Sequence, residues 1–181
     1  ILKFYDPNYP VFIATDASGE GIGAVAYQPS PDDGDQITPF NIIEIFSRKL
    51  NGSQYNYSAY KKELFALVNA LKRFYPYIYG RSDTVVYTDC RPLLYVKNYL
   101  KQPPTQAISS WLDVLSEVNF TVRHRPGVLN TLPDALSRAW VREYNKNGVW
   151  GVPLPTVHLD ITEEEKLLPI DQDVGLRTLV K

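Results

Sequence analysis

The chain has 181 residues, of which 44% are hydrophobic, and its formal net charge at pH 7 is −1. This length suffices for one well-cored domain plus an appendage, and the apolar content excludes an intrinsically disordered chain. The near-neutral charge counts against tight, independent binding to nucleic acid, because free-standing nucleic-acid binders are usually basic.

Three strands are predicted in the first quarter of the chain. Apolar runs at 11–14 and 22–27 flank the turn-forming stretch 17–21. A loop rich in Pro, Asp and Gly at 28–38 precedes an alternating stretch at 42–47, which predicts the third strand. Consecutive strands of this kind favour an antiparallel meander.

The clearest helix follows the third strand. Apolar residues recur at helical spacing from 64 to 74, Ser58 is a suitable N-cap, and Pro76 and Gly80 are expected to end the helix. Because this helix leads into a further strand, the chain changes here from a meander to alternating helices and strands.

The rest of the folded region alternates strands with helices. Strands are predicted at 84–88 and 120–123, and helices at 92–99, 105–118 and from 133 to 142. Such alternation favours parallel additions to a sheet, so we expect an α/β protein with a mixed sheet flanked by helices.

The pattern weakens after residue 142. We therefore predict a folded domain over 1–142 and a C-terminal linker or extension over 143–181, with Trp140 and Trp150 packing the extension against the domain. A capping-box pattern at 162–165 predicts one short helix in this extension.

Two acidic residues, Asp16 and Asp89, end predicted strands. Ligands of open α/β sheets gather at the carboxyl ends of the strands, so the two carboxylates would meet if the first and fourth strands are parallel neighbours. Taken singly, each residue could instead begin a turn.

Two more carboxylates lie on predicted helices. Leu67 lies four residues after Glu63, which puts Glu63 on or beside the inward helix face, where a charge is costly without a partner. Alone, Glu63 could be a solvated helix-edge charge, and Asp134 a helix-start charge favoured by the dipole. Together, four converging carboxylates would repel one another without cations, and such hard oxygen ligands suit Mg²⁺ or Mn²⁺.

Several groups of residues occur in a recognisable order: Thr15-Asp16-Ala17-Ser18 with Gly21-Ile22-Gly23-Ala24-Val25, Phe46-Ser47-Arg48-Lys49-Leu50, Asn56-Tyr57-Ser58 with Lys62-Glu63-Leu64, Thr88-Asp89 with Arg91-Pro92-Leu93, and Arg125-Pro126-Gly127 with Asn130 and Asp134-Ala135-Leu136-Ser137-Arg138. In this order they resemble the ribonuclease H (RNase H) domain of Ty3/Gypsy-type LTR-retrotransposon reverse transcriptases. The resemblance runs from about Phe4 to Arg138.

This resemblance implies an RNase H-like fold with a five-stranded mixed sheet and a catalytic, metal-binding set of Asp16, Glu63, Asp89 and Asp134. It implies an endonuclease that cuts the RNA strand of RNA–DNA hybrids with two Mg²⁺ ions, for which Mn²⁺ can substitute. It also implies a polymerase domain in the same polyprotein as partner, and an intracellular location in a cytoplasmic virus-like particle or the nucleus. The absence of Met and the single Cys90 agree with a piece of a longer chain in a reducing compartment.

His124 lies ten residues before Asp134, in the loop expected after the fifth strand. Cellular RNases H carry a mobile histidine at that spacing, and an imidazole that titrates near neutrality could shuttle a proton. Alternatively, His124 contacts phosphate or solvent between Arg123 and Arg125. Only its position in the fold separates the two hypotheses.

Substrate contacts are expected from two kinds of residue. Cations beside the site would contact phosphates, although a solvated helix face is the simpler interpretation of any single lysine. Small polar residues would contact 2′-hydroxyls in the shallow minor groove of an A-like hybrid. The candidates are Arg48, Lys62 and Arg125 in the first group and Ser18, Gly19, Glu20 and Gln28 in the second.

Two alternative functions stay open. One is a catalytically inactive RNase H-like domain that serves as a connection or protein-interaction module, and the presence of all four carboxylates counts against it. The other is a DNA-cutting nuclease of the integrase type, against which the position of Glu63 on the helix after the third strand speaks. No apolar run approaches the ~20 residues of a membrane span, so no membrane partner is expected.

Overall fold

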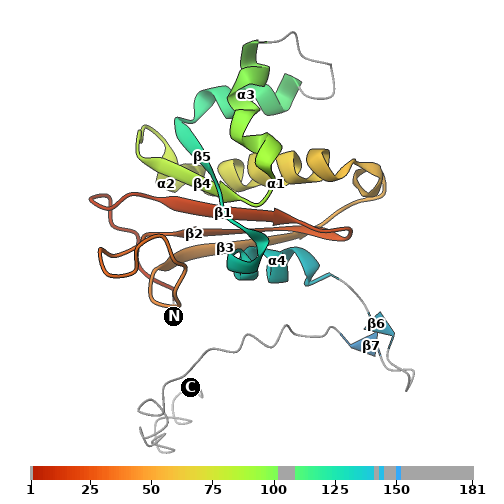
Figure 1. Cartoon of the computed structure of the whole chain (residues 1–181), viewed down its shortest axis with the longest axis horizontal. Coiled ribbons are helices and arrows are strands. Elements are labelled where there is room, and N and C mark those ends of the chain that lie inside the picture. Colours follow the sequence, from red (N-terminus) through yellow and green to blue (C-terminus); the bar gives the residue numbers. More distant parts are fainter. Residues whose placement is uncertain (1, 102–108, 141–142, 145–149, 152–181) are drawn as a thin grey trace, which may run out of the picture.

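The computed structural model of the chain describes residues 2–101, 109–140, 143–144 and 150–151. Five strands form one sheet in the order β3-β2-β1-β4-β5 (Figure 1). Their bounds are β1 Phe12–Ala17, β2 Gly21–Tyr27, β3 Ile42–Lys49, β4 Thr84–Thr88 and β5 Phe120–His124. The three leading strands pair antiparallel, whereas β1–β4 and β4–β5 pair in parallel. The mixed sheet predicted from the pattern of elements is confirmed.

Helices cover both faces of this sheet, with α1 and α3 on one side and α4 on the other (Figure 1). The helices are η1 Gln54–Asn56, α1 Ala59–Arg73, α2 Tyr75–Ile78, η2 Arg91–Lys101, α3 Ser109–Glu117, η3 Gly127–Leu129 and α4 Thr131–Arg138. A separate two-stranded ladder pairs β6 Glu143–Tyr144 with β7 Trp150–Gly151. Among the described residues, no helix is long and apolar enough to span a membrane.

Local sequence signals place the ends of α1. Ser58 is the N-cap, and its hydroxyl accepts a hydrogen bond from the Lys61 N–H at 3.3 Å, as expected. The helix ends at Arg73, and Pro76 then lies in the first turn of the separate helix α2 instead of ending α1. A proline is tolerated there because the first N–H groups of a helix have no partner within it.

Two other predicted helices differ in form. The stretch predicted as a helix at 92–99 is the 3₁₀ helix η2. The helix predicted at 105–118 is observed from Ser109, and residues 102–108 lie outside the described part. The predicted helix at 162–168 also lies outside it, and the boundary at residue 142 stays a prediction.

Both faces of the central strands are buried. All seven residues of β2 are buried, because helices cover the sheet on each side. Side chains alternate along β1, with Ile13 in the large core beneath α1 and Ala14 in a smaller cluster on the other face. Leu132 and Leu136 of α4 pack against that second cluster. The sheet is therefore a fixed platform between two helical layers.

Two glycines of β2 let α4 lie directly on the sheet. A Cβ at Gly23 would lie 2.4 Å from the Pro133 carbonyl oxygen and 2.6 Å from the Ser137 nitrogen. At Gly21, a Cβ would lie 2.6 Å from Cδ1 of Trp140 and 2.7 Å from the Ser137 carbonyl oxygen. Real Cβ atoms do not approach backbone this closely, so a side chain here would push α4 away.

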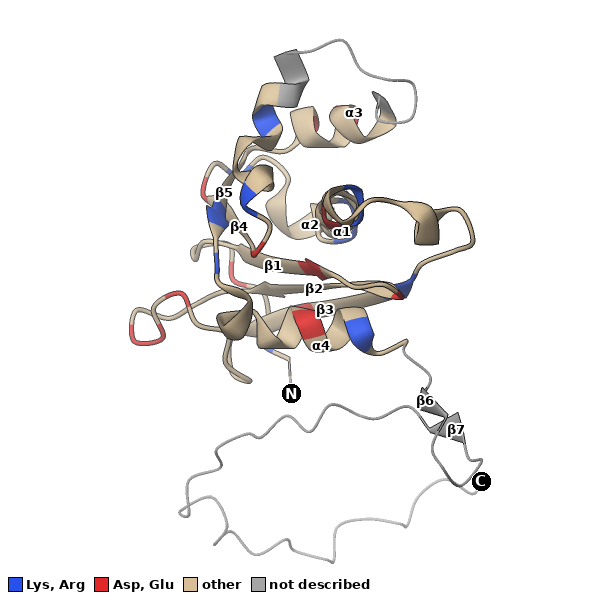
Figure 2. Cartoon of the chain, turned by 45° about the vertical axis from the view of Figure 1, so that its right-hand side comes forward, with Lys and Arg blue, Asp and Glu red and all other residues tan. Residues whose placement is uncertain are grey.

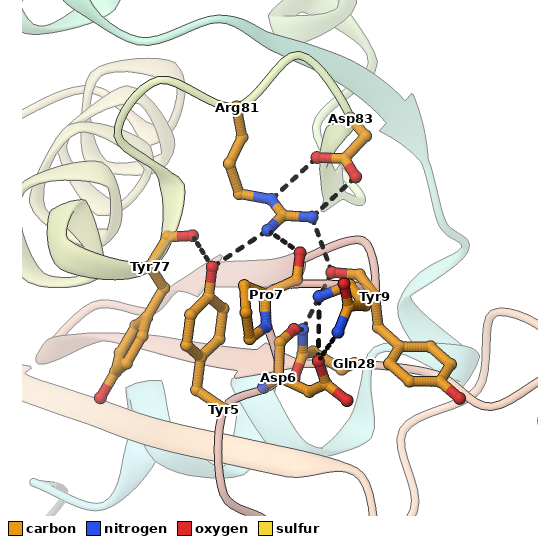
Figure 3. Close-up of polar contacts among 9 residues, drawn as sticks. Tyr5, Asp6, Pro7, Tyr9, Gln28, Tyr77, Arg81 and Asp83 are labelled. Carbon is orange, nitrogen blue, oxygen red and sulfur yellow. Dashed lines mark hydrogen bonds and ion pairs between the residues drawn. The ribbon is translucent and has the colours of Figure 1, made fainter.

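The segment before β1 is tied to the domain by Gln28 and Arg81 (Figure 3). The fully buried Gln28 donates from Nε2 to the carbonyl oxygens of Asp6 and Tyr9, at 2.6 and 2.9 Å, and accepts at Oε1 from the Asp6 N–H at 2.9 Å. Arg81 donates to the carbonyl oxygens of Pro7 and Tyr9 at 2.9 and 2.7 Å. The amide of Gln28 is occupied by main chain, which corrects its expected role in substrate binding.

The close approach of α4 to β2 at Gly23 predicts that Gly23→Ala destabilises the domain. Because the obstructing atoms are backbone, we expect the free energy of unfolding to fall by about 1–3 kcal/mol, as for other overpacked sites. Urea unfolding followed by circular dichroism measures the change. Gly52→Ala is the matched control, because a Cβ at Gly52 meets nothing within 4 Å. Equal stability of the two variants would contradict the packing argument.

Candidate metal centre

The parallel pairing of β1 and β4 brings two carboxylates together. Ala14 is paired with Tyr87, and two further residues along this register place Asp16 opposite Asp89. Asp16 is the penultimate residue of β1, whose pairing with β2 continues through Ala17, and is 5% exposed. Asp89 directly follows the last residue of β4 and is exposed. The meeting at the strand ends therefore occurs as expected from the sequence.

Glu63 of α1 completes a group of three. Carboxylate oxygens of Asp16, Glu63 and Asp89 all lie within 4.8 Å of one another. Figure 2 shows acidic stretches on β1, at the end of β4 and on α1. Glu63 Oε1 accepts a hydrogen bond from the Ala17 N–H at 3.3 Å. Its buried Oε2 atom has no hydrogen-bond partner among the described residues.

Burial and mutual repulsion disfavour the charged forms of this cluster. Burial raises the pKa of Asp16 to about 6, with a smaller contribution from the charges of Asp134 and Asp89 and an opposing one from a Ser137 hydrogen bond. Burial and, to a smaller extent, the charges of Asp16 and Asp89 together raise the pKa of Glu63 to about 9. A cation among these oxygens would stabilise the charged carboxylates and so oppose both shifts.

Ser137 of α4 orients Asp16. Its hydroxyl donates to Asp16 Oδ2 at 2.7 Å, and its own carbonyl oxygen accepts from the Ser18 hydroxyl at 2.7 Å. The Ser18 oxygen in turn accepts from the N–H groups of Glu20 and Gly21. Ser18 is thus a largely buried turn residue that also lines the pocket beside Glu63, and its contact with substrate stays a prediction. Ser137 was not predicted as a site residue, and its signal in the sequence is its place within the group Asp134-Ala135-Leu136-Ser137-Arg138.

Asp134, the fourth predicted ligand, lies outside the group of three. It is the fourth residue of α4, and its Oδ1 accepts from Arg138 Nε at 2.7 Å. The Asp134 side chain is 41% exposed and the Arg138 side chain 62%. Asp134 still lies near the cluster, because its charge contributes to the raised pKa of Asp16. The structure therefore brings three of the four carboxylates together and holds the fourth on an arginine.

His124 is the last residue of β5, not part of the loop after it. His124 pairs with Thr88, the residue before Asp89. His124 and Asp89 therefore lie at the same end of the sheet, at the ends of the neighbouring strands β5 and β4. The His124 side chain is partly buried. This places the imidazole next to the element that carries one of the clustered carboxylates.

Arg125 is built into the interior. Its side chain donates to the Tyr27 hydroxyl at 2.6 Å and to the Asp35 carbonyl oxygen, and its guanidinium lies 4.0 Å from the Tyr87 ring centroid. Only 7% of the residue is exposed. These contacts occupy the guanidinium, which corrects its expected role in binding phosphate. Asp35 belongs to the loop between β2 and β3, so this loop contacts the Arg125 side chain.

The remaining candidates lie on the surface. Gly19, Lys62 and Glu63 line an open pocket of about 320 Å³ beside the cluster. Arg48 is exposed and donates to Asn69 Oδ1 at 3.0 Å. Glu20 is partly buried in the turn between β1 and β2. Of these four candidates, Gly19 and Lys62 line the same pocket as Glu63.

Comparison with known proteins agrees with this geometry. The model of a family described as the RNase H-like domain found in reverse transcriptase matches residues 6–118. The Tf2-3 and Tf2-4 transposon polyproteins of Schizosaccharomyces pombe are each 30% identical over 139 residues, which is 76% of this chain. The chain spans about a tenth of the length of these polyproteins, since the matches cover 10% of each.

Solved structures share the fold at lower identity. A foamy viral protease-reverse transcriptase in complex with RNA/DNA hybrid is 19% identical, with a TM-score of 0.52 over 74% of this chain and 17% of that one. An LC11-RNase H1 in complex with RNA/DNA hybrid is 18% identical, with a TM-score of 0.50 over 70% of this chain and 92% of that one. These likenesses show the fold of the domain.

The raised pKa values predict that the metal-free protein loses stability as pH rises. When folded, Asp16 and Glu63 hold protons up to pKa values of about 6 and 9, whereas the ordinary pKa values of these side chains are 3.8 and 4.5. The folded state therefore binds more protons between these limits, so the contribution of these two groups to stability is fully present below about pH 4 and is lost as pH rises toward about 9. Thermal unfolding in EDTA between pH 5 and 9 measures the slope.

The variant Glu63→Gln separates the pH dependence caused by the carboxylate cluster from that caused by other titrating groups of the protein. The variant should flatten the slope and raise Tm at pH 8, where about 1 kcal/mol corresponds to roughly 2–8 °C for domains of this size. Asp113→Asn, at an exposed carboxylate of α3, is the control and should keep the wild-type slope. An unchanged Glu63→Gln profile would show that repulsion in the cluster does not affect stability.

Proposed function

Because the chain belongs to the family of RNase H-like domains found in reverse transcriptases, we propose that it is a ribonuclease H that cuts the RNA strand of RNA–DNA hybrids during reverse transcription of a retroelement. The observation that carries the proposal is the cluster of Asp16, Glu63 and Asp89 at the carboxyl ends of β1 and β4. A scaffold domain has no need of three mutually repelling carboxylates.

Divalent cations fit this donor set. The three carboxylates offer oxygens within 4.8 Å of one another, and the buried Oε2 of Glu63 has no protein partner among the described residues. Hard oxygen donors suit Mg²⁺, with Mn²⁺ as a substitute, and Asp134 would join them from α4. A bound pair of such ions would supply Lewis-acid activation of water and stabilise the leaving oxygen of a phosphodiester.

The chain's own groups hold these donors in place. The Ala17 N–H fixes one oxygen of Glu63, and the Ser137 hydroxyl fixes Oδ2 of Asp16. The first constraint comes from β1 itself and the second from α4, which packs on the sheet, so the free oxygens keep their directions. Asp89 is the most exposed of the three, which makes it the carboxylate nearest to an incoming substrate. In this proposal His124, at the adjoining end of β5, moves a proton during the reaction.

The hybrid substrate and the polymerase partner are inferred from relatives. The foamy viral and LC11 structures are described as complexes with RNA/DNA hybrid, and the similar transposon proteins are polyproteins. A net charge of −1 supplies little attraction to a duplex, so a polymerase domain of the same polyprotein would help to hold it. The place of action would then be intracellular, in a cytoplasmic virus-like particle or the nucleus.

One observation favours an inactive connection domain instead. Asp134 is paired with Arg138, so the cluster holds three carboxylates and not four. An ion pair between two exposed side chains contributes little, however, and it yields readily to a bound cation. The ribonuclease is therefore the preferred function, and cleavage distinguishes it from the inactive domain.

Cleavage of a labelled RNA–DNA hybrid with Mg²⁺ is the direct test of the proposed function. We expect the wild type to cut the RNA strand and Asp89→Asn to lose at least ~100-fold in rate, since even outer partners of metal ligands cost 10–100-fold. Asp113→Asn, an exposed change on α3, should cut normally. A wild type that fails at high enzyme concentration and low salt would contradict an autonomous enzyme.

A second measurement addresses the proton shuttle. His124→Ala should slow cleavage by about tenfold or more and remove an ionisation near neutrality from the pH–rate profile, with unchanged dependence on Mg²⁺ concentration. Arg123→Ala, at the preceding and largely exposed position, serves as the control. A wild-type rate and pH profile for His124→Ala would reduce the imidazole to a structural group.

A further inference from the structure

Arg138 places a cation at the rim of the carboxylate cluster. It is the last residue of α4, and its Nε donates to Asp134 Oδ1 at 2.7 Å. In Figure 2 an acidic and then a basic stretch follow one another along this helix. The same side chain lines the open pocket that contains Glu63. Arg138 thus lies between the fourth carboxylate and the space beside the other three.

That pocket has the chemistry of an anion site. It has a volume of about 320 Å³ and opens between the turn after β1 and the start of α1, where Gly19 and Ala59 line it. Lys62 and Arg138 supply two cations to its wall. The Lys62 ammonium makes a long contact of 3.5 Å with the Gly19 carbonyl oxygen, and a contact of this length is easily exchanged for another acceptor.

The contact between Arg138 and Asp134 is easily exchanged. The two residues are four apart on one helix, and their side chains are 62% and 41% exposed. Pairs of this kind contribute about 0.3–0.5 kcal/mol, because water screens them and both side chains must be held in place. A phosphate offers the guanidinium two parallel hydrogen bonds and a larger negative charge. A phosphate in the pocket would therefore outcompete Asp134.

We propose that this pocket is a subsite for a backbone phosphate of the nucleic acid, and that Arg138 exchanges Asp134 for that phosphate. The exchange releases the Asp134 carboxylate toward Asp16, Glu63 and Asp89. Binding of the substrate and completion of the carboxylate set are then linked through one side chain. The inference rests on the proposed function, because the nucleic acid and the cluster both belong to it.

Binding of a fluorescent RNA–DNA hybrid tests the subsite. Measured by anisotropy in Mg²⁺ on an Asp89→Asn background, which prevents cleavage, Arg138→Gln should weaken binding about five- to tenfold. It should also reduce the slope of log affinity against log salt by about one, the loss of one phosphate contact. Lys62→Gln should act in the same direction.

Arg73→Gln is the matched control. It removes one positive charge from an arginine of similar exposure, since the Arg73 side chain is 58% exposed. Arg73 contacts Glu44 at 2.6 Å and does not line the pocket. Its salt slope should equal that of the parent protein. Both arginine variants should unfold in urea within about 0.5 kcal/mol of the parent, as surface substitutions do. Equal affinity and salt slope for Arg138→Gln and Arg73→Gln would overturn the subsite.

The exchange itself is tested without nucleic acid. On the otherwise unaltered protein, Arg138→Gln should leave the Mg²⁺ concentration needed for thermal stabilisation unchanged or lower it about twofold, the equivalent of the ion-pair energy. A clearly higher requirement would mean that Arg138 positions Asp134 for the cation, and would overturn the exchange. Absence of Mg²⁺-dependent cleavage by the wild type, with weakened hybrid binding by Arg138→Gln, would contradict the ribonuclease and support the phosphate subsite.

Discussion

The contact of α4 with the two glycines of β2 determines the geometry of the site. Because Gly21 and Gly23 carry no side chain, the backbone around Ser137 lies against the sheet, and its hydroxyl reaches Asp16 at 2.7 Å. The same contact sets the distance from the cluster to Asp134 and Arg138, one on either side of Ser137. A helix held one side chain's width farther out would leave Asp16 without this partner.

Near that contact, buried carboxylates destabilise the folded protein. Asp16 and Glu63 are placed where burial and neighbouring charge raise their pKa values to about 6 and 9. Natural proteins keep such destabilising groups at functional sites, where a ligand relieves them. The large core beneath α1 and the second cluster beneath α4 bury apolar side chains, and this burial offsets the electrostatic cost of the carboxylate cluster. Stability and function are thus opposed within the same few residues.

Two groups of cations in the domain differ in their availability, which net charge alone does not reveal. Arg81 and Arg125 are structural, because carbonyl oxygens from distant segments occupy their guanidinium groups. Lys62 and Arg138 remain at an open pocket beside the carboxylates. A chain with a net charge of −1 can therefore still present two positive groups where a phosphate would lie. Local placement, and not overall charge, governs what this surface can bind.

Local patterns in the sequence determined the strands, the N-cap of α1 at Ser58, and the position of Asp16, Glu63 and Asp89 at strand ends and on an inward helix face. These features depend on neighbours a few residues away, which the sequence displays. Only the tertiary structure decided that Gln28 and Arg125 are buried and that Ser137, 121 residues from Asp16, is its partner. The reason is physical: a polar side chain is available or occupied according to which distant backbone groups and side chains the folded chain brings within hydrogen-bonding distance.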